Sequence, residues 1–202
     1  MNERMVRAPD PDIHARRRAQ LVDAVFRVVA RDGIEGVSVR VVASEAGLSM
    51  GSLRHYFATQ AELLAFSLGE VERRMRARLA GLEASGDPRD GLERVLHQLI
   101  PLTPESRVEH EIWLAFAGKA VAEPTLHELN ARVYDDLRAL LRRLVPDVLG
   151  PGRDAELETE RLYALVDGLV LHAALRPGEM TPDRMVDVIR YHLDTLAYPA
   201  PR

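Results

Sequence analysis

Apolar residues recur along this chain at the three- and four-residue spacing of amphipathic helices, and no stretch keeps the two-residue alternation of a strand long enough to suggest a sheet. The pattern predicts an all-α protein of about nine helices without internal repeats. A first helix is expected to end at Asp32 and Gly33, and two short helices are expected within residues 38–57. The later helices are expected over about 60–82, 88–100, 104–122, 124–145, 155–175 and 182–196.

Residues 38–64 predict two short helices joined by a tight turn. Ser38 can cap the first helix, and Gly47 can end it because glycine adopts a positive φ without a steric clash. Ser49 can then cap the second helix. The expected apolar positions are Val39, Val42, Ala43, Ala46, Leu48, Leu53 and Phe57. This arrangement is a helix-turn-helix, and its second helix could enter a DNA major groove.

Within this stretch, AGLSMGSLRHYFATQAELL resembles the recognition-helix signature of the TetR (tetracycline-repressor) family of bacterial transcriptional regulators, AGVS.GTLY.YF..K..LL. The resemblance covers about fifty N-terminal residues and implies binding to double-stranded operator DNA. Further on, EIWLAFAGKAVAEPTLHELNARVYDDLRALL resembles the C-terminal domain of the BetI-like branch. Two positions depart from the family pattern: Arg54 stands where tyrosine is common, and Gln60 where a phosphate-contacting lysine usually opens the next helix.

The candidate DNA contacts lie on the helix-turn-helix and beside it. They are Arg17, Ser38, Arg40, Ser49, Met50, Gly51, Ser52, Arg54, His55, Tyr56 and Gln60. The run Arg16 to Arg18 has two interpretations that the sequence leaves open. It is either a solvated helix face or, beside a helix-turn-helix, a source of phosphate contacts.

The chain divides into three expected parts: a disordered arm over 1–12, a DNA-binding domain over 13–58, and a ligand-binding and dimerisation domain over 59–198. Thr59 and Glu62 have the spacing of a capping box, which predicts that a long helix begins at Gln60 and links the two domains.

Composition narrows the possible environments. The chain of 202 residues has no cysteine, no apolar run long enough to span a membrane, and no signal-peptide core near its start. We therefore expect a cytoplasmic protein. Residues 1–60 hold nine arginines against seven acidic residues, while the whole chain has a net charge of −4. A basic end on an acidic body favours DNA binding through one end only.

The sequence contains no recognisable catalytic or metal-binding motif. HExxH, CxxC and GxxxxGK[ST] are all absent. His110 lies between Glu109 and Glu111, but adjacent helix residues point to different sides and could not share one ion. We expect neither an enzyme nor a cofactor or metal site.

The C-terminal domain has candidate effector contacts among its apolar and unusual polar residues. They are Met75, Leu79, His110, Trp113, Phe116 and Lys119, the last being the only lysine. Either these side chains form a packed core, or some of them line a cavity for an apolar small molecule, as the family resemblance implies. The sequence does not decide between the two.

The last two predicted helices carry apolar residues on more than one stripe, which predicts association with a second copy. The expected interface residues are Leu162, Val166, Leu169, Ile189 and Leu193. The expected function is a homodimeric repressor that binds a palindromic operator and is released by a small molecule. The alternative is a DNA-binding regulator whose C-terminal domain only dimerises or binds a protein partner.

Overall fold

The computed structural model describes residues 11–83 and 86–197, and over these ranges the fold is all α, with no strand. Its helices are α1 (Pro11–Asp32), α2 (Val39–Glu45), α3 (Met50–Tyr56), α4 (Gln60–Ala80), α5 (Pro88–Gln98), α6 (Pro104–Ala122), α7 (His127–Leu144), α8 (Ala155–Leu175) and α9 (Pro182–Leu196). Three short 3-10 turns join them: η1 (Ile34–Gly36), η2 (Pro124–Leu126) and η3 (Val145–Val148).

Side-chain caps explain where most of these helices begin. In each case a short polar side chain accepts a hydrogen bond from a backbone N–H of the first turn, which has no partner within the helix. The capping residues are Ser38, Ser49, Thr59, Asp87, Thr103, Asp154 and Thr181. Proline follows the cap in α5, α6 and α9, where its missing N–H costs nothing.

The predicted boundaries need three adjustments. Helix α1 already includes residues 11 and 12 of the predicted arm, and residues 1–10 lie outside the described residues. The single helix predicted over 124–145 is split into η2 and α7. The capping box at Thr59 is incomplete, because Glu62 accepts from the N–H of Ala58 and not from that of the cap itself.

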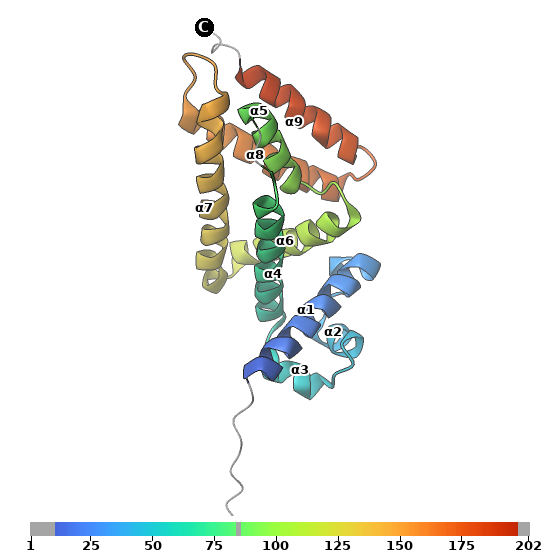
Figure 1. Cartoon of the computed structure of the whole chain (residues 1–202). Coiled ribbons are helices and arrows are strands. Elements are labelled where there is room, and N and C mark those ends of the chain that lie inside the picture. Colours follow the sequence, from blue (N-terminus) through green and yellow to red (C-terminus); the bar gives the residue numbers. More distant parts are fainter. Residues whose placement is uncertain (1–10, 84–85, 198–202) are drawn as a thin grey trace, which may run out of the picture.

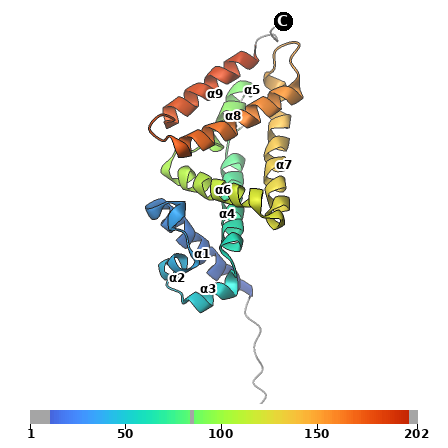
Figure 2. The ribbon, with the colours of Figure 1, turned by 180° about the vertical axis from the view of Figure 1, so that it is seen from behind.

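The described chain has two parts joined by α4 (Figure 1). We call α1–α3 the head and α5–α9 the body. Helix α4 runs from the head into the body, with α7 lying alongside it. Viewed from behind, α6 crosses α4 while α8 and α9 lie at the end of the body farthest from the head (Figure 2). Helix α6 of the body contacts α4 and also α1 of the head, so it joins the two parts directly.

Three clusters of buried apolar side chains hold these parts together. The head cluster includes Leu21, Val25, Leu53 and Phe57, and it also contains Ile112 from α6. The largest cluster joins α5, α8 and α9 in the body. A small third cluster lies between α4 and α6. The head is therefore completed by a side chain that belongs to the body.

No helix in the described part of the chain combines the length and the apolar character needed to cross a membrane.

Candidate nucleic-acid interface and internal cavity

The α2–α3 unit has the geometry predicted for a helix-turn-helix. Gly47 has φ +67°, and the N–H of Leu48 donates to the carbonyl of Ala43 at 2.8 Å, which closes the turn after α2. Leu53 and Phe57 are fully buried against α1. These contacts fix the position of α3 and leave its opposite side facing solvent.

Five of the predicted DNA contacts are exposed residues of α3: Met50, Gly51, Ser52, Arg54 and His55. Tyr56 is only half exposed, and its ring meets that of His55 edge to face at 5.7 Å. Within the described residues no carboxylate pairs with Arg54 or with the exposed Arg40 of α2. Both guanidinium groups are thus available for phosphate or base contacts.

Several other predicted DNA-contacting residues also make hydrogen bonds within the protein. The hydroxyl groups of Ser38 and Ser49 accept from backbone N–H groups as helix caps. The side-chain amide of Gln60 donates to the carbonyl of Val37 at 2.8 Å and ties the start of α4 to the head. Arg17 is exposed and donates to Gln20 at 3.0 Å. Each of these side chains supports the head whether or not it also touches DNA.

The arginine run of α1 does not behave as a single surface. Arg16 and Arg17 are exposed, whereas the guanidinium of Arg18 lies 4.2 Å from the ring centre of Phe66 and 5.2 Å from that of Phe57. Such stacking is a cation–π contact. Arg18 therefore packs the start of α1 against α3 and α4.

A cavity, which we call the body cavity, lies between α4 and the body helices α6, α7 and α8, and about 80 Å³ of it can hold the centres of water-sized molecules. Most of its wall is apolar. The apolar and aromatic lining residues are Leu68, Val71, Met75, Leu99, Trp113, Val133, Leu137, Tyr163, Val166 and Val170. An apolar wall with a few polar groups is typical of small-molecule sites.

The predicted effector contacts divide between cavity and core. Met75, His110 and Trp113 line the cavity. Leu79 lies one turn beyond Met75 and lines an adjoining groove between α4 and α7, which shares Met75 with the cavity. Phe116 is fully buried against α4, so the packed-core interpretation holds for it.

Lys119 is outside the cavity as well. It lies on a half-buried flank of α6, one turn after Ala115, and its ammonium is 4.0 Å from the carboxylate of Glu123. The structure therefore removes Leu79, Phe116 and Lys119 from the set of cavity-lining residues.

The polar cavity wall includes a tight ion pair. Both terminal nitrogens of Arg78 donate to the carboxylate of Glu109, at 3.0 and 2.7 Å. Such fork-shaped pairing satisfies both groups and fixes their orientation. Glu109 is almost fully buried, so the pair compensates a charge that would otherwise be costly.

His110 is held between two backbone carbonyl groups. Its Nδ1 lies 2.6 Å from the Ser106 carbonyl and its Nε2 lies 3.0 Å from that of Leu99. Burial lowers the pKa of this imidazole. A neutral ring has one N–H and can donate to only one of the two carbonyls. The side chain thus ties α6 to the end of α5 while it lines the cavity.

Asp167 of α8 also lines the cavity, although the sequence analysis did not place it among the effector contacts. It makes no hydrogen bond or ion pair with any described residue, and burial raises its pKa to about 6. Burial also raises the pKa of the neighbouring Tyr163 hydroxyl. The run YALVDGLVL offered a signal for this residue, because it places a single carboxylate in an otherwise apolar helix segment.

The predicted interface residues of α8 and α9 need correction. Leu162, Val166, Leu169, Ile189 and Leu193 are all at most 4% exposed and form the core of their own subunit. The outer side of α8 instead shows Leu157, Leu171 and Leu175, and α9 shows Tyr191, each between 44% and 75% exposed. The sequence pattern did not reveal which of two apolar stripes faces inward.

Among the described residues, no group of three His, Asp or Glu side chains lies close enough together to hold a metal ion.

Comparison with known proteins supplies the family. Residues 21–65 match the profile of bacterial regulatory proteins of the tetR family, and residues 88–197 match that of the C-terminal part of BetI-type transcriptional repressors. The chain belongs to the TetR family. It is similar to the HTH-type transcriptional regulator PksA of Bacillus subtilis (strain 168), with 37% identity over 91% of each chain. It is also similar to BetI of Burkholderia thailandensis, with 33% identity over 91% of this chain and 94% of that one.

Solved structures agree with this assignment. A transcriptional regulator from Rhodococcus sp. Rha1 has a TM-score of 0.79 and 33% identity, covering 89% of this chain and 95% of that one. A regulator from Saccharomonospora viridis in complex with choline shares the fold, with a TM-score of 0.79 and 22% identity over 89% of this chain and 96% of that one. The multidrug binding protein EbrR complexed with ethidium has a TM-score of 0.63 and 28% identity, covering 87% and 98%. This TetR-family chain is a DNA-binding transcriptional regulator and not an enzyme.

Proposed function

We propose that this regulator is a dimeric repressor that binds a palindromic operator with α3 of each subunit and is released when a small organic molecule occupies the body cavity. The observation that carries the proposal is an apolar cavity walled partly by α4, the helix that leads directly into the head. The choline complex of the Saccharomonospora viridis regulator and the ethidium complex of EbrR support a ligand-binding role for bodies of this fold.

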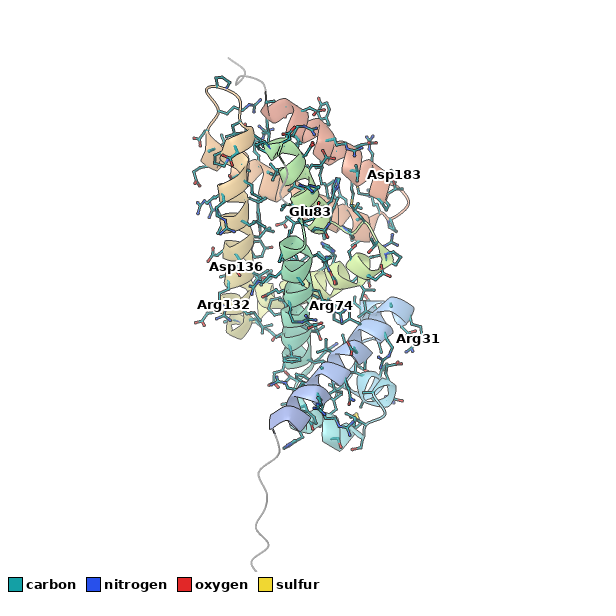
Figure 3. The ribbon with its side chains drawn as sticks, in the orientation of Figure 1. Arg31, Arg74, Glu83, Arg132, Asp136 and Asp183 are labelled. Atoms are coloured by element: carbon teal, nitrogen blue, oxygen red, sulfur yellow. The ribbon has the colours of Figure 1, made fainter. Side chains whose placement is uncertain are left out.

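Two pairs of adjacent residues connect the cavity to the head. On α4, Met75 lines the cavity, while the guanidinium of Arg74 lies 4.1 Å from the ring centre of Phe26 and 3.4 Å from the carboxylate of Asp23, both on α1. Figure 3 labels Arg74 on α4. A ligand that displaces α4 at Met75 would change these contacts. Only a difference in ligand affinity between the two arrangements is needed for release.

On α6, Trp113 lines the cavity while Ile112 belongs to the head cluster. A shift of α6 towards or away from a ligand would therefore also move a side chain packed in the head. Together α4 and α6 provide two mechanical connections between the ligand and α3.

The outer stripe of α8, with Tyr191 of α9 beside it, supports dimerisation. Between the exposed residues Leu157 and Leu171 the same helix side carries Ala164 and Gly168, whose small size lets a second helix approach closely. A two-fold contact of this kind would present two copies of α3. Successive major grooves on one face of DNA are about 34–36 Å apart, so the dimer must hold its heads near that spacing.

Mapping the DNA sites bound by the full chain, then measuring operator affinity by fluorescence anisotropy, tests the proposal. Arg54→Ala should weaken specific binding by about 1–3 kcal/mol if the guanidinium reads a base bidentately. Arg143→Ala, which removes an exposed arginine at the far end of α7, should leave affinity unchanged. Unchanged affinity in a folded Arg54→Ala variant would remove this residue from the interface.

A compound panel tests the ligand response in the same assay. Compounds that bind the body should lower operator affinity. If bound compounds never change it, the body only dimerises or meets a protein partner, and the proposed release by ligand fails.

A further inference from the structure

The charges around the cavity do not balance. Arg78 is matched by Glu109, with a closest contact of 2.7 Å, whereas Arg76 is shared between Glu72 of the same helix at 3.4 Å and Asp136 of α7 at 2.7 Å. The remaining charged lining residue is Asp167, which has no partner among the described residues. Burial lowers the pKa of His110, which disfavours a positive charge on its ring. The cavity wall is therefore negative overall, and Asp167 is the carboxylate in it with no cationic partner among the described residues.

This carboxylate lies in apolar surroundings. Its neighbours on α8, Val166 and Val170, line the same cavity, as does Leu137 of α7. A carboxylate in such a place loses hydration without gaining a hydrogen bond, which is a cost to the folded protein. A ligand that supplies the missing positive charge would recover part of that cost.

Two aromatic side chains share the cavity with Asp167. Trp113 and Tyr163 both line it, and Tyr134 packs against each of them, with ring centres 6.5 and 5.6 Å away. Aromatic rings attract cations, including those without N–H groups, through the negative potential of their faces. The combination of one free carboxylate, aromatic rings and aliphatic walls fits a cation with an apolar body.

Other ligand classes fit less well. An anion would need a free cationic group, but both terminal nitrogens of Arg78 are already held by Glu109. A neutral ligand would leave Asp167 uncompensated and further dehydrated. Binding of an anion or of a neutral ligand would therefore carry an electrostatic free-energy cost that binding of a cation avoids.

We propose that the effector of this regulator is an organic monocation, with Asp167 as its counter-ion and with Trp113 and Tyr163 in contact with its charged group. This inference rests on the proposed function, since it assumes that the effector occupies the body cavity. It adds the charge of the ligand and the residue that selects for it.

The chain provides its own probe of binding, because Trp113 is the only tryptophan. Its fluorescence can be followed during titration with benzyltrimethylammonium, with the neutral isostere neopentylbenzene, and with phenylacetate as an anion. The full-length protein is compared with Asp167→Asn, which keeps the shape and removes the charge. Asp135→Asn, an exposed carboxylate on α7, controls for the overall change in charge.

We expect the cation to bind more tightly than the other two probes, and Asp167→Asn to weaken cation binding about tenfold or more while Asp135→Asn does not. Equal cation affinity in the wild type and Asp167→Asn would overturn the assignment of the counter-ion. Tighter binding of the neutral or anionic probe would overturn the cation class but leave a ligand-responsive regulator in place.

The same titrations are repeated with operator DNA bound. If cations bind in the cavity and depend on Asp167 but never alter operator affinity, the charge selectivity stands and the proposed release by ligand fails. If no probe of any charge changes Trp113 fluorescence, the inference is overturned, while operator release by some other compound would still support the proposed function.

Discussion

The head and the body of this regulator are packed for different purposes. The head encloses fully buried aliphatic and aromatic side chains such as Val25, Leu53 and Phe57, and none of its helices contributes to the cavity wall. The body instead leaves a cavity between three of its helices and α4, and the carboxylate of Asp167, which has no partner among the described residues, lines it. A surface that binds DNA must keep one geometry, whereas a domain that responds to a ligand must be able to change its packing when the ligand enters. The difference shows that one all-α chain can assign rigidity and adaptability to separate regions.

The largest expected effect on stability comes from placing a charge in the core of the body. Ile189 is fully buried, so Ile189→Arg should lower the free energy of unfolding by more than about 4 kcal/mol or leave the chain insoluble. Urea unfolding followed by circular dichroism would measure the loss.

The matched change on the outer side of α8 is Leu171→Arg, at a residue 44% exposed in the single chain. It should give a folded protein that sediments as a monomer and has lost operator binding. A Leu171→Arg variant that remains a dimer at micromolar concentration would show that the outer stripe is not the interface.

A second test targets the point where the two regions meet. Ile112→Ala should cost about 2–5 kcal/mol of stability, because it opens a void in the head cluster from a helix of the body. Val121→Ala, on the same helix but 84% exposed, should change stability by less than about 0.5 kcal/mol. Equal losses in the two variants would mean that the head does not depend on α6.

A third test concerns the cost of the free carboxylate. The pKa of Asp167 is raised from 3.8 to about 6 in the folded chain, so the folded state binds more protons than the unfolded state between these pH values. The stability that the folded state gains from protonating Asp167 is fully present below about pH 4 and is lost as pH rises through about 6. Asp167→Asn should therefore be more stable than the wild type at pH 7, by about 1–2 kcal/mol after allowing for partial exposure.

The test is to measure the unfolding midpoints of the wild type and of Asp167→Asn between pH 4 and pH 8. The difference between the two midpoints should change with pH. Taking the difference cancels contributions from the other titratable groups near the cavity, which are Glu72, Glu109, His110, Tyr134 and Tyr163. A constant difference across this pH range would contradict the assignment of the titration to Asp167.

The smallest expected effect is in the head. Ser49→Ala removes the hydroxyl that accepts from the Ser52 N–H at 3.1 Å and should cost about 1 kcal/mol. Ser44→Ala, at an exposed position within α2, should be neutral or slightly stabilising. Guanidinium unfolding curves of the two variants would show whether the cap at Ser49 stabilises the head as local geometry predicts.

Sequence reasoning succeeded where the controlling interactions are local. The caps at Ser38 and Ser49 and the turn at Gly47 each depend on neighbours within a few residues, and all three were predicted correctly. The starts of α6 and α9 were equally accessible, because Pro104 and Pro182 mark them.

Sequence reasoning was less informative where packing between distant segments decides. Leu169 and Ile189 are apolar whichever way their helices turn, and only tertiary packing shows that they face the core. Phe116 and Trp113 lie on the same helix, but side chains from α4, α7 and α8 determine which of them borders a cavity. Asp167 carried a readable signal, since a lone acid in an apolar segment is unusual, but its lack of a partner is a property of the fold.

The place of Ile112 in the head cluster also limits how such regulators can be recombined. A head transferred to another body would end at α3 or α4 in the chain but would leave Ile112, a member of its own core, behind in α6. The graft would work only where the new body offers a side chain of similar size at that position. Exchange of DNA-reading modules among relatives should therefore succeed more often when the α1–α6 contact surface is transplanted together with the head.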